Sequence, residues 1–558
     1  MVALGGLALI LFMHQTSLDT MSTLPSNLGD PSLSTWILSW EWHAITSEPA
    51  RFFQGNMFHP FGDAIKYSEL MLPLVPVFGP ISTLSGDPIL GINLTMLGLS
   101  LLSFIATYML ARRFTGSCAA VLAAVSFTFS GYVFMHQSHL QLLTLGFFPL
   151  GFLALFRVLE YRRMRDGVWL GVCSALLTTG SFYYGAIWFV CIGVVLIADA
   201  IRLRIPGRDW WVSVGASVAV SVLFLGPIAY VFFQFQAEVP FVRDTAGYGL
   251  RPLDFLTPAP GSLIYSELLD WTAANRTGGA VEHGFFLGLV TPALTAIGGV
   301  SLLAESWSRR PRGQLQDYRR REMWWMVLAG IVALSVAVGP SLFGVPLPLH
   351  FLRTFVPGFD AMRAISRLAV PGLLTASLLA ALSLDRLIRG RSADSRLILA
   401  AVVISVVMLE MYVEPITVEI SDPPEVIIVL SEAAGGAVVE LPMRETFDAQ
   451  FALMEGPRLL ASVGDWRPRF NGYSGGVPPG YMEYVTILNQ FPAPGALAAL
   501  DDLGIRYVVL HGGDERTEAT YSRSDIDGIL AALPVGASFD RYGDDWLIDL
   551  EVSVGPPG

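Results

Sequence analysis

The chain has 558 residues, of which 53% are hydrophobic and only 15% are charged, whereas an ordinary soluble domain carries about 25% charged residues. This composition excludes a single soluble globule. The apolar residues come in blocks of about twenty, which is the length that crosses a bilayer as a helix. The net charge of −12 argues against a nucleic-acid partner, which would need a basic surface. The sequence therefore predicts a multi-pass, α-helical membrane protein.

Eleven apolar segments are expected to cross the membrane. The first has no basic residue before it, which leaves open whether the true N-terminus lies upstream. The stretch 71–84 is also apolar, but its three prolines favour a re-entrant or interfacial element over a span. The expected spans are residues 2–13, 88–111, 116–134, 140–159, 168–182, 185–201, 211–234, 284–303, 323–341, 367–388 and 396–413.

Arginine sets the expected orientation, because basic loops stay in the cytoplasm during insertion. More than half of the 35 basic residues fall in five short loops, at 112–115, 157–166, 202–210, 304–322 and 386–396. With these loops and the N-terminus inside, two long loops and the C-terminal region face outward: residues 14–87, 235–283 and 414–558. All eight histidines then lie outside. Polar chemistry is either concentrated on that face, or simply has no room in the short inner loops.

The C-terminal region differs in composition from the rest of the chain. Short β-branched runs at 437–441 and 507–510 predict strands, and 481–490, 494–503 and 524–533 are expected to be helical. We therefore expect a transmembrane domain over 1–413 and an extracytoplasmic α/β domain over 414–558. The three cysteines lie inside apolar blocks, so neither a disulfide framework nor a thiolate metal site is expected.

The first outer loop contains the leading candidate carboxylates, Asp30 and Glu69. Between them, residues 32–46 are expected to form an interfacial helix with Trp36 and Trp40 on one face. Such aromatic side chains either anchor among lipid headgroups or stack on sugar rings.

Two histidines lie three residues apart at the outer end of two expected spans. His136 and His139 could share a helical face as metal ligands, could bind a polar ligand by hydrogen bonds, or could be satisfied by headgroups and water. Tyr183 is expected at the same level.

Three arginines are the other outward cations near the membrane: Arg353, Arg363 and Arg367. Guanidinium groups bind phosphate bidentately, although interfacial arginines also reach lipid phosphates without a dedicated site. Glu282 stands at the outer end of a span, where a carboxylate is costly unless it is used or paired. We expect it to pair with one of these arginines.

Taken together, these motifs resemble the GT-C type of bacterial membrane glycosyltransferase. The resemblance rests on the Gly-Asp-Pro at 29–31 with its Trp-rich helix, Asn-Met-Phe-His-Pro at 56–60 and Tyr-Ser-Glu at 67–69. Further similar stretches are His139-Leu140-Gln141, Pro-Gly-Phe-Asp-Ala-Met-Arg at 357–363, Trp-Arg-Pro at 466–468 and Asn-Gly-Tyr-Ser-Gly at 471–475.

The resemblance implies transfer of a sugar from a polyprenyl-phosphate carrier to a glycan, lipid or protein acceptor on the outer face of the bacterial cytoplasmic membrane. It also implies an acid in the first outer loop as the base or a metal ligand, and Asp30 fits that position. Many GT-C proteins have paired acids that hold a divalent metal, but Pro31 and Ser32 follow Asp30 here, so metal dependence stays open. Glu69, His136, His139, Tyr183, Glu282, Arg353, Arg363 and Arg367 are the expected substrate-binding residues. The alternatives are a flippase or transporter of lipid-linked saccharide, and a non-catalytic membrane scaffold.

Overall fold

The computed structural model describes residues 2–14, 22–240, 242–275, 280–307 and 314–550. These residues form two compact units. Unit 1 comprises the described residues of Met1–Asp19, Met71–Pro73 and Asn93–Ile416, and unit 2 those of Thr20–Leu70, Leu74–Ile92 and Thr417–Gly558.

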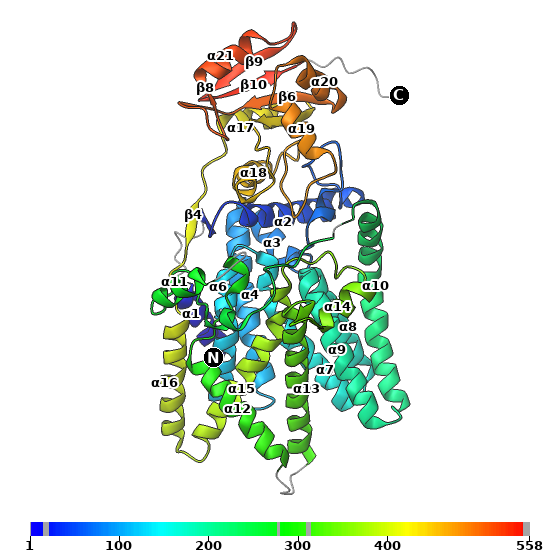
Figure 1. The fold of residues 1–558 in the computed structure, drawn as a ribbon, viewed down its shortest axis with the longest axis vertical. Coiled ribbons are helices and arrows are strands. Elements are labelled where there is room, and N and C mark those ends of the chain that lie inside the picture. The colour runs from blue at the N-terminus through cyan, green and yellow to red at the C-terminus, as the bar shows by residue number, and fades with distance from the viewer. Residues whose placement is uncertain (1, 15–21, 241, 276–279, 308–313, 551–558) are drawn as a thin grey trace. The chain divides into compact units, whose positions relative to one another are not determined.

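Unit 1 is built from long helices that run side by side (Figure 1). The closest packed pairs are α8 with α10, α12 with α15, α7 with α8 and α5 with α15. Its helices are α1 (Val2–Met13), α4 (Pro88–Ala111), α5 (Ser117–Thr128), α6 (Gly131–Met135), α7 (Phe147–Tyr161), α8 (Met164–Gly180), α9 (Phe182–Leu203), α10 (Arg208–Glu238), α11 (Ser266–Ala274), α12 (Val290–Trp307), α13 (Gln314–Ala337), α14 (Pro348–Phe355), α15 (Val370–Ile388) and α16 (Ala393–Met411).

Each of the eleven expected spans coincides with helical structure. Within the described residues, six segments are long and apolar enough to cross a membrane; the number of crossings beyond these six stays a prediction. The expected inner loops lie at the connections between consecutive helices. Three arginines of the loop 304–322, Arg309, Arg310 and Arg312, lie outside the described residues. The six segments are Pro88–Ala111, Ser117–Met135, Leu140–Tyr161, Phe182–Leu203, Arg208–Glu238 and Ile365–Ile388.

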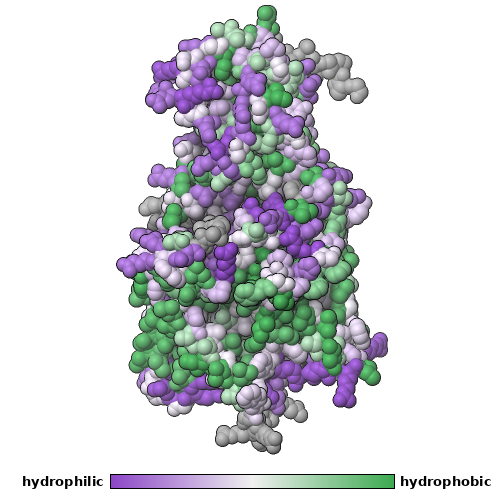
Figure 2. All heavy atoms as spheres, viewed as in Figure 1, coloured by the Kyte–Doolittle hydropathy of each residue, from purple (hydrophilic) through white to green (hydrophobic). Residues whose placement is uncertain are grey.

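The outward faces of unit 1 are apolar. Large side chains such as Leu223 and Phe224 on α10, Val300 on α12 and Ile398 on α16 are exposed, and Figure 2 shows hydrophobic residues as a broad band across the visible face of the helical part. A water-soluble protein rarely exposes so large an apolar surface. The band is the lipid-facing surface of a membrane-embedded protein.

Close helix contacts in unit 1 depend on glycine. A Cβ on Gly298 of α12 would lie 2.2 Å from the backbone oxygen of Leu379 on α15. Two hydrogen bonds cross the same interface, from Thr295 Oγ1 to the carbonyl of Ala376 (2.8 Å) and from Ser383 Oγ to the carbonyl of Leu294 (2.5 Å). The small residue lets the backbones approach closely enough for hydroxyls to bridge them.

Unit 2 contains a four-stranded sheet in the order β5-β6-β10-β9, in which β5 and β6 are parallel and the other neighbours are antiparallel. Helix α17 packs on one face of this sheet through an apolar cluster that includes Val426, Leu430, Val509 and Leu547. The elements are β1 (Thr23–Pro25), α2 (Asp30–Ser47), α3 (Val75–Ser85), β4 (Thr417–Glu419), α17 (Glu425–Glu432), β5 (Ala437–Leu441), α18 (Ala449–Ala461), α19 (Tyr481–Leu488), α20 (Pro494–Asp502), β6 (Ile505–Leu510), β7 (Gly512–Gly513), β8 (Tyr521–Ser522), α21 (Arg523–Ala531), β9 (Ser538–Tyr542) and β10 (Asp545–Asp549).

The strands and helices predicted for the C-terminal region are confirmed to within a few residues. The compact units, however, do not follow the predicted division at 413/414. Residues 20–70 group with the C-terminal region, because β1 pairs with β4 and α2 packs on α18. Unit 2 is thus assembled from two distant stretches of chain.

Trp36 and Trp40 form part of the core of unit 2. Both indoles are buried; Trp36 Nε1 donates to Asn56 Oδ1 (2.8 Å) and Trp40 Nε1 donates to the carbonyl of Phe52 (2.9 Å). The ring of Trp466 packs edge-on against Trp40 at 5.4 Å between centroids. The prediction that these two tryptophans face headgroups or sugars was wrong, because the C-terminal stretch covers them.

Candidate functional site

A buried ionic group lies in unit 1 at the helix ends opposite the arginine-rich loops. Arg367 donates from Nε to Glu282 Oε2 (2.9 Å) and from Nη2 to Glu282 Oε1. His136 Nε2 lies 3.3 Å from the same Oε2. All three side chains are buried, so the predicted pairing of Glu282 with an interfacial arginine is confirmed, and Arg367 is its partner.

Local backbone structure brings these three residues together. His136 follows the last residue of α6, Glu282 lies in a 3-10 turn over Ala280–His283, and Arg367 lies in another over Ile365–Ala369. The backbone N–H of Gly131 donates to the carbonyl of Phe286 (2.8 Å). This contact holds the start of α6 against the segment that carries Glu282.

The surroundings of Glu282 favour its ionised form. Burial works to raise the pKa of Glu282, but the charge and hydrogen bonds of Arg367 and His136 outweigh it and hold that pKa well below its usual range. The carboxylate is therefore ionised, and its charge is committed to the pair with Arg367.

Further cations surround this pair. Arg367 lies over the ring of Tyr183 (5.1 Å), and Arg363 lies over the ring of Tyr248 (5.0 Å). The hydroxyl of Tyr183 accepts from the backbone N–H of Arg363 (3.2 Å). Burial, together with the neighbouring Arg363 and Arg367, lowers the pKa of Arg243. Arg243 was not predicted from the sequence, where it is one of many loop arginines, and the group of cations is suited to an anion.

Arg363 and Arg367 differ in their surroundings. The guanidinium of Arg367 is buried against Glu282, whereas Arg363 is exposed. Arg353 binds the loop that follows α10. Its Nη2 donates to the carbonyl of Arg243 (2.9 Å), and its Nη1 donates to Thr245 Oγ1 (3.3 Å). Arg363 is thus the cation of the predicted set that solvent or a ligand reaches most easily.

The two histidines do not form a metal site. Their ring centroids are 5.7 Å apart, but His136 Nδ1 contacts the carbonyl of Tyr132 (2.8 Å) and its Nε2 contacts Glu282. His139 is partly exposed, with Nδ1 3.1 Å from Ser138 Oγ. Over the described parts of the chain, no group of three His, Cys, Asp or Glu side chains is arranged to hold a metal.

Asp30 and Glu69 lie in unit 2. Asp30 is the first residue of α2, is half-buried, and accepts a hydrogen bond from the hydroxyl of Tyr473 (2.5 Å). A carboxylate at a helix N-terminus is stabilised by the helix dipole. Glu69 is also half-buried and follows the 3-10 turn Ala64–Tyr67.

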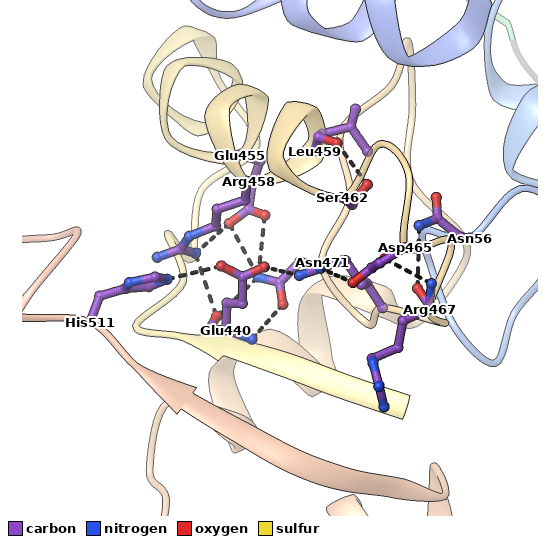
Figure 3. Close-up of polar contacts among 11 residues, drawn as sticks. Asn56, Glu440, Glu455, Arg458, Leu459, Ser462, Asp465, Arg467, Asn471 and His511 are labelled. Atoms are coloured by element: carbon purple, nitrogen blue, oxygen red, sulfur yellow. Dashed lines mark hydrogen bonds and ion pairs between the residues drawn. The ribbon is translucent and has the colours of Figure 1, made fainter. Parts of the chain in front are cut away.

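A second polar network in unit 2 was not predicted (Figure 3). Glu440 Oε1 accepts from Arg469 Nη1 (2.6 Å), and its Oε2 lies 2.9 Å from His511 Nε2. Asn471 Nδ2 donates to the carbonyl of Glu440 (3.0 Å) and to Glu455 Oε2 (3.2 Å). The opposing charges in this network compensate one another.

The carboxylates of this network are buried, and their oxygens are occupied by hydrogen bonds and ion pairs within the protein. The network therefore has a structural role. Glu440 and Glu455 are buried; Glu455 also pairs with Arg458 (2.8 Å). Burial alone would raise the pKa of Glu440, but the hydrogen bond from His511 and the charge of Arg469 hold it at about 2. The only sequence signal was a single glutamate inside an otherwise apolar strand.

Residues 2–409 match the model of a family described as a domain of unknown function, DUF6311. No curated protein matches the chain. The structure is similar to that of the arabinofuranosyltransferase AftD from Mycobacteria, with a TM-score of 0.57 and 15% identity, over 98% of this chain and 39% of that one.

A variant of AftD gives a similar result, with a TM-score of 0.58 and 15% identity, over 98% of this chain and 41% of that one. The chain thus spans about two fifths of the length of AftD. The likeness confirms the predicted GT-C-like fold.

Proposed function

The chain belongs to the DUF6311 family, and we propose that it is a membrane glycosyltransferase that moves a sugar from a polyprenyl-phosphate carrier to an acceptor. The observation that carries the proposal is the cationic group around the buried Arg367–Glu282 pair, at the helix ends opposite the arginine-rich loops of a GT-C-like fold. The other support is the sequence resemblance.

The arginines would bind the phosphate of the donor. Glu282 fixes the guanidinium of Arg367 in one orientation, and Arg363 is held over Tyr248 with its charge exposed. Fixed positive charge stabilises the negative charge that develops on a departing phosphate. Arg243 adds a third cation next to both, so no metal is needed to compensate for the phosphate charge.

We propose an inverting displacement at the anomeric carbon. The bond between that carbon and the carrier phosphate oxygen breaks, and its electron pair leaves with the phosphate. A new bond forms between the acceptor hydroxyl oxygen and the same carbon. The hydroxyl proton passes to Asp30, whose hydrogen bond from Tyr473 orients the carboxylate. General-base assistance of this kind contributes about 10²- to 10⁴-fold to a rate.

The remaining predicted residues would contact the sugar or hold the site. Glu69 and His139 are partly exposed and are proposed to bind sugar hydroxyls. Tyr183 accepts backbone hydrogen bonds from Arg363 and Ala364, so its role is to position that loop. Arg353 supports the same loop through the carbonyl of Asp360 (3.4 Å).

We place the protein in the bacterial cytoplasmic membrane with its N-terminus inside and its C-terminal region outside. This assignment is supported by the arginine-rich loops, which lie at the opposite helix ends from Glu282 and Arg367. The donor would then be used on the outer face, and the acceptor would be a glycan, lipid or protein there.

The test is an activity assay with the purified protein, polyprenyl-phosphate sugars and acceptor extracts. We expect Asp30→Ala to lower kcat by about 10²-fold or more, with little change in the KM of the donor. We expect Arg363→Ala mainly to raise the KM of the donor. Arg541→Ala, which removes an exposed arginine of unit 2, is the matched control and should leave both constants unchanged. Full activity of Asp30→Ala would exclude Asp30 as the base.

The transporter alternative has less support. A path for a charged headgroup requires polar groups along the middle of the spans. The segments Ser117–Met135, Leu140–Arg157 and Val370–Asp385 contain no charged residue before their last position. Arg113, which pairs with Glu322 and Glu160, and Glu160 itself lie at helix ends. Donor transport without transfer in proteoliposomes would favour this alternative.

A further inference from the structure

The segment between α13 and the span that starts at Ile365 exposes a group of large apolar side chains. Residues 341–356, which we name the lip, comprise the hairpin of β2 (Ser341–Leu342) and β3 (Val345–Pro346) and the short helix α14. Its exposed apolar residues are Leu342, Phe343, Val345, Phe351, Phe355 and Val356.

Phe343 lies at the tip of the hairpin. Its side chain is 97% exposed, and its backbone has a φ of 50°, followed by 79° at Gly344. A two-residue hairpin turn of this kind favours asparagine or glycine, and a bulky residue with positive φ is strained. The hairpin therefore holds a phenylalanine where the backbone disfavours it and where unit 1 does not cover it, which points to an apolar partner outside the protein.

Helix α14 presents two different faces. Leu349 is buried, and Arg353 one turn later binds the carbonyl of Arg243 (2.9 Å). Phe351 and Phe355 are also one turn apart but lie on the other face, where Phe355 is 75% exposed. One face thus fastens the helix to unit 1, and the other face is free to contact something apolar.

Composition and connectivity identify this partner as lipid. From residue 323 to residue 359 the chain contains no aspartate or glutamate, so nothing in the lip repels anionic headgroups. The lip begins four residues after α13 ends at Ala337 and ends nine residues before the span Ile365–Ile388 begins. A segment tied this closely to a membrane span stays near the bilayer surface, and interfacial segments combine apolar and basic side chains in this way.

We propose that the lip inserts Phe343, Phe351 and Phe355 into the boundary between headgroups and acyl chains of the bilayer. Through Arg353, the lip is joined to the loop that carries Arg243, whose backbone N–H donates to the carbonyl of Asp360 (3.0 Å). Insertion of the lip therefore brings the membrane surface to the arginines that bind phosphate. This second step rests on the proposed function, whereas membrane contact of the lip does not.

Fluorescence quenching by lipid tests the contact. Single cysteines replace Phe343, Phe355, Phe224 on α10 or Val535 of unit 2 in a chain whose native cysteines are changed to alanine. Each cysteine carries an environment-sensitive fluorophore, and the protein is reconstituted in phosphatidylcholine–phosphatidylglycerol nanodiscs with brominated acyl chains.

We expect quenching at 343 and 355 to match that at the lipid-facing residue 224 and to exceed that at the exposed residue 535. Quenching at 343 and 355 no stronger than at 535 would overturn the proposal. The same holds if the labels are shielded from water without quenching, because the lip would then be covered by a second copy or another protein.

A kinetic experiment tests what the contact does. With an assay established for the proposed transfer, Phe343→Ser/Phe355→Ser should raise the KM of a long-chain polyprenyl donor several-fold. It should leave the KM of a short-chain, water-soluble donor and the kcat unchanged. Equal effects on both donors would contradict a role in lipid access. Membrane quenching without any transferase activity would refute the proposed function and leave the contact standing.

Discussion

The Arg367–Glu282 pair is the residue-scale feature that most constrains unit 1. Two charges are taken out of water, and the cost is offset only because the guanidinium and the carboxylate meet through two hydrogen bonds. The pair therefore contributes more to the uniqueness of the site than to stability. If either partner is removed, the other remains as an uncompensated buried charge.

This argument predicts a strongly non-additive double-mutant cycle. Glu282→Gln and Arg367→Met should each lower the free energy of unfolding by about 3–5 kcal/mol, whereas the double variant should recover much of that loss. Asp317→Asn, which removes an exposed partner of Arg320, should cost less than about 1 kcal/mol. The free energy of unfolding of the two single variants, the double variant and Asp317→Asn is measured against the unchanged protein by chemical denaturation in detergent. Additive single effects would show that the two side chains do not act as a pair.

Some residue roles could be predicted from sequence and others could not. The cost of a lone carboxylate at a span end was enough to pair Glu282 with an arginine. Trp36 and Trp40 were misassigned, because Trp466, which packs on Trp40, and helix α18, which packs on α2, lie about 400 residues further along the chain, and amphipathic position alone does not reveal them. Glu440 was missed for the same reason: its partners Arg469 and His511 are 29 and 71 positions distant.

At the scale of elements, glycine positions decide which helices approach closely. Gly298 and Gly299 are neighbours in α12, but only Gly298 faces α15; a Cβ on Gly299 would meet nothing within 4 Å. The sequence predicts both helices from their apolar lengths, yet it does not distinguish these two glycines.

We therefore predict opposite effects of the same substitution at adjacent positions. Gly298→Ala should force α12 away from Leu379 and destabilise the protein by about 1–3 kcal/mol. Gly299→Ala should be neutral or stabilise the helix by up to about 1 kcal/mol. Thermal unfolding of the two variants in one detergent provides the measurement, and equal melting temperatures would contradict the packing described for α12.

The Glu440 network joins β5, β6 and α18, and it predicts a pH optimum for unit 2. The pKa of Glu440 is about 2 against an ordinary 4.5, so its contribution is present above pH 4.5 and is lost as the pH falls toward 2. Burial alone would lower the pKa of His511, but Asp545 and Glu440 raise it above 6.5. That contribution is complete below pH 6.5 and is lost as the pH rises through the folded pKa.

Burial also raises the pKa of Glu455, which favours the protonated carboxyl and adds to the loss at higher pH. Stability of unit 2 should therefore be greatest in the weakly acidic range, with the Glu455 contribution declining above pH 4.5 and the His511 contribution declining above pH 6.5. Hydrogen exchange of the β5 and β6 amides in the full chain, measured across this range, tests the prediction. His511→Gln should flatten the alkaline limb, and Glu440→Gln should flatten the acid limb. An unchanged profile in both variants would exclude the network as its source.

At the scale of the whole molecule, unit 2 depends on two stretches of chain that are far apart. Strand β1 pairs with β4, and Asn56 Nδ2 donates to the carbonyl of Arg467 (3.2 Å). Trp466 is half-buried in the full chain. We predict that it is more exposed in residues 417–550 alone than in a fusion of residues 20–70 to 417–550 through a flexible linker. Tryptophan emission should be red-shifted in the fragment and blue-shifted in the fusion. Identical spectra would mean that the C-terminal stretch folds without the first.

The discontinuity of unit 2 also has a consequence in time. About 325 residues separate Ile92 from Thr417, and ribosomes add about 5–20 residues per second. For roughly fifteen seconds to a minute, the segment with Trp36 and Trp40 is already synthesised, whereas the stretch of unit 2 that begins at Thr417 is not. During this interval Trp40 lacks its contact with Trp466, and α2 lacks its contact with α18. A chain stalled before Thr417 would therefore expose an apolar surface that chaperones and proteases recognise. Unit 2 can therefore be completed only after every helix of unit 1 has been synthesised.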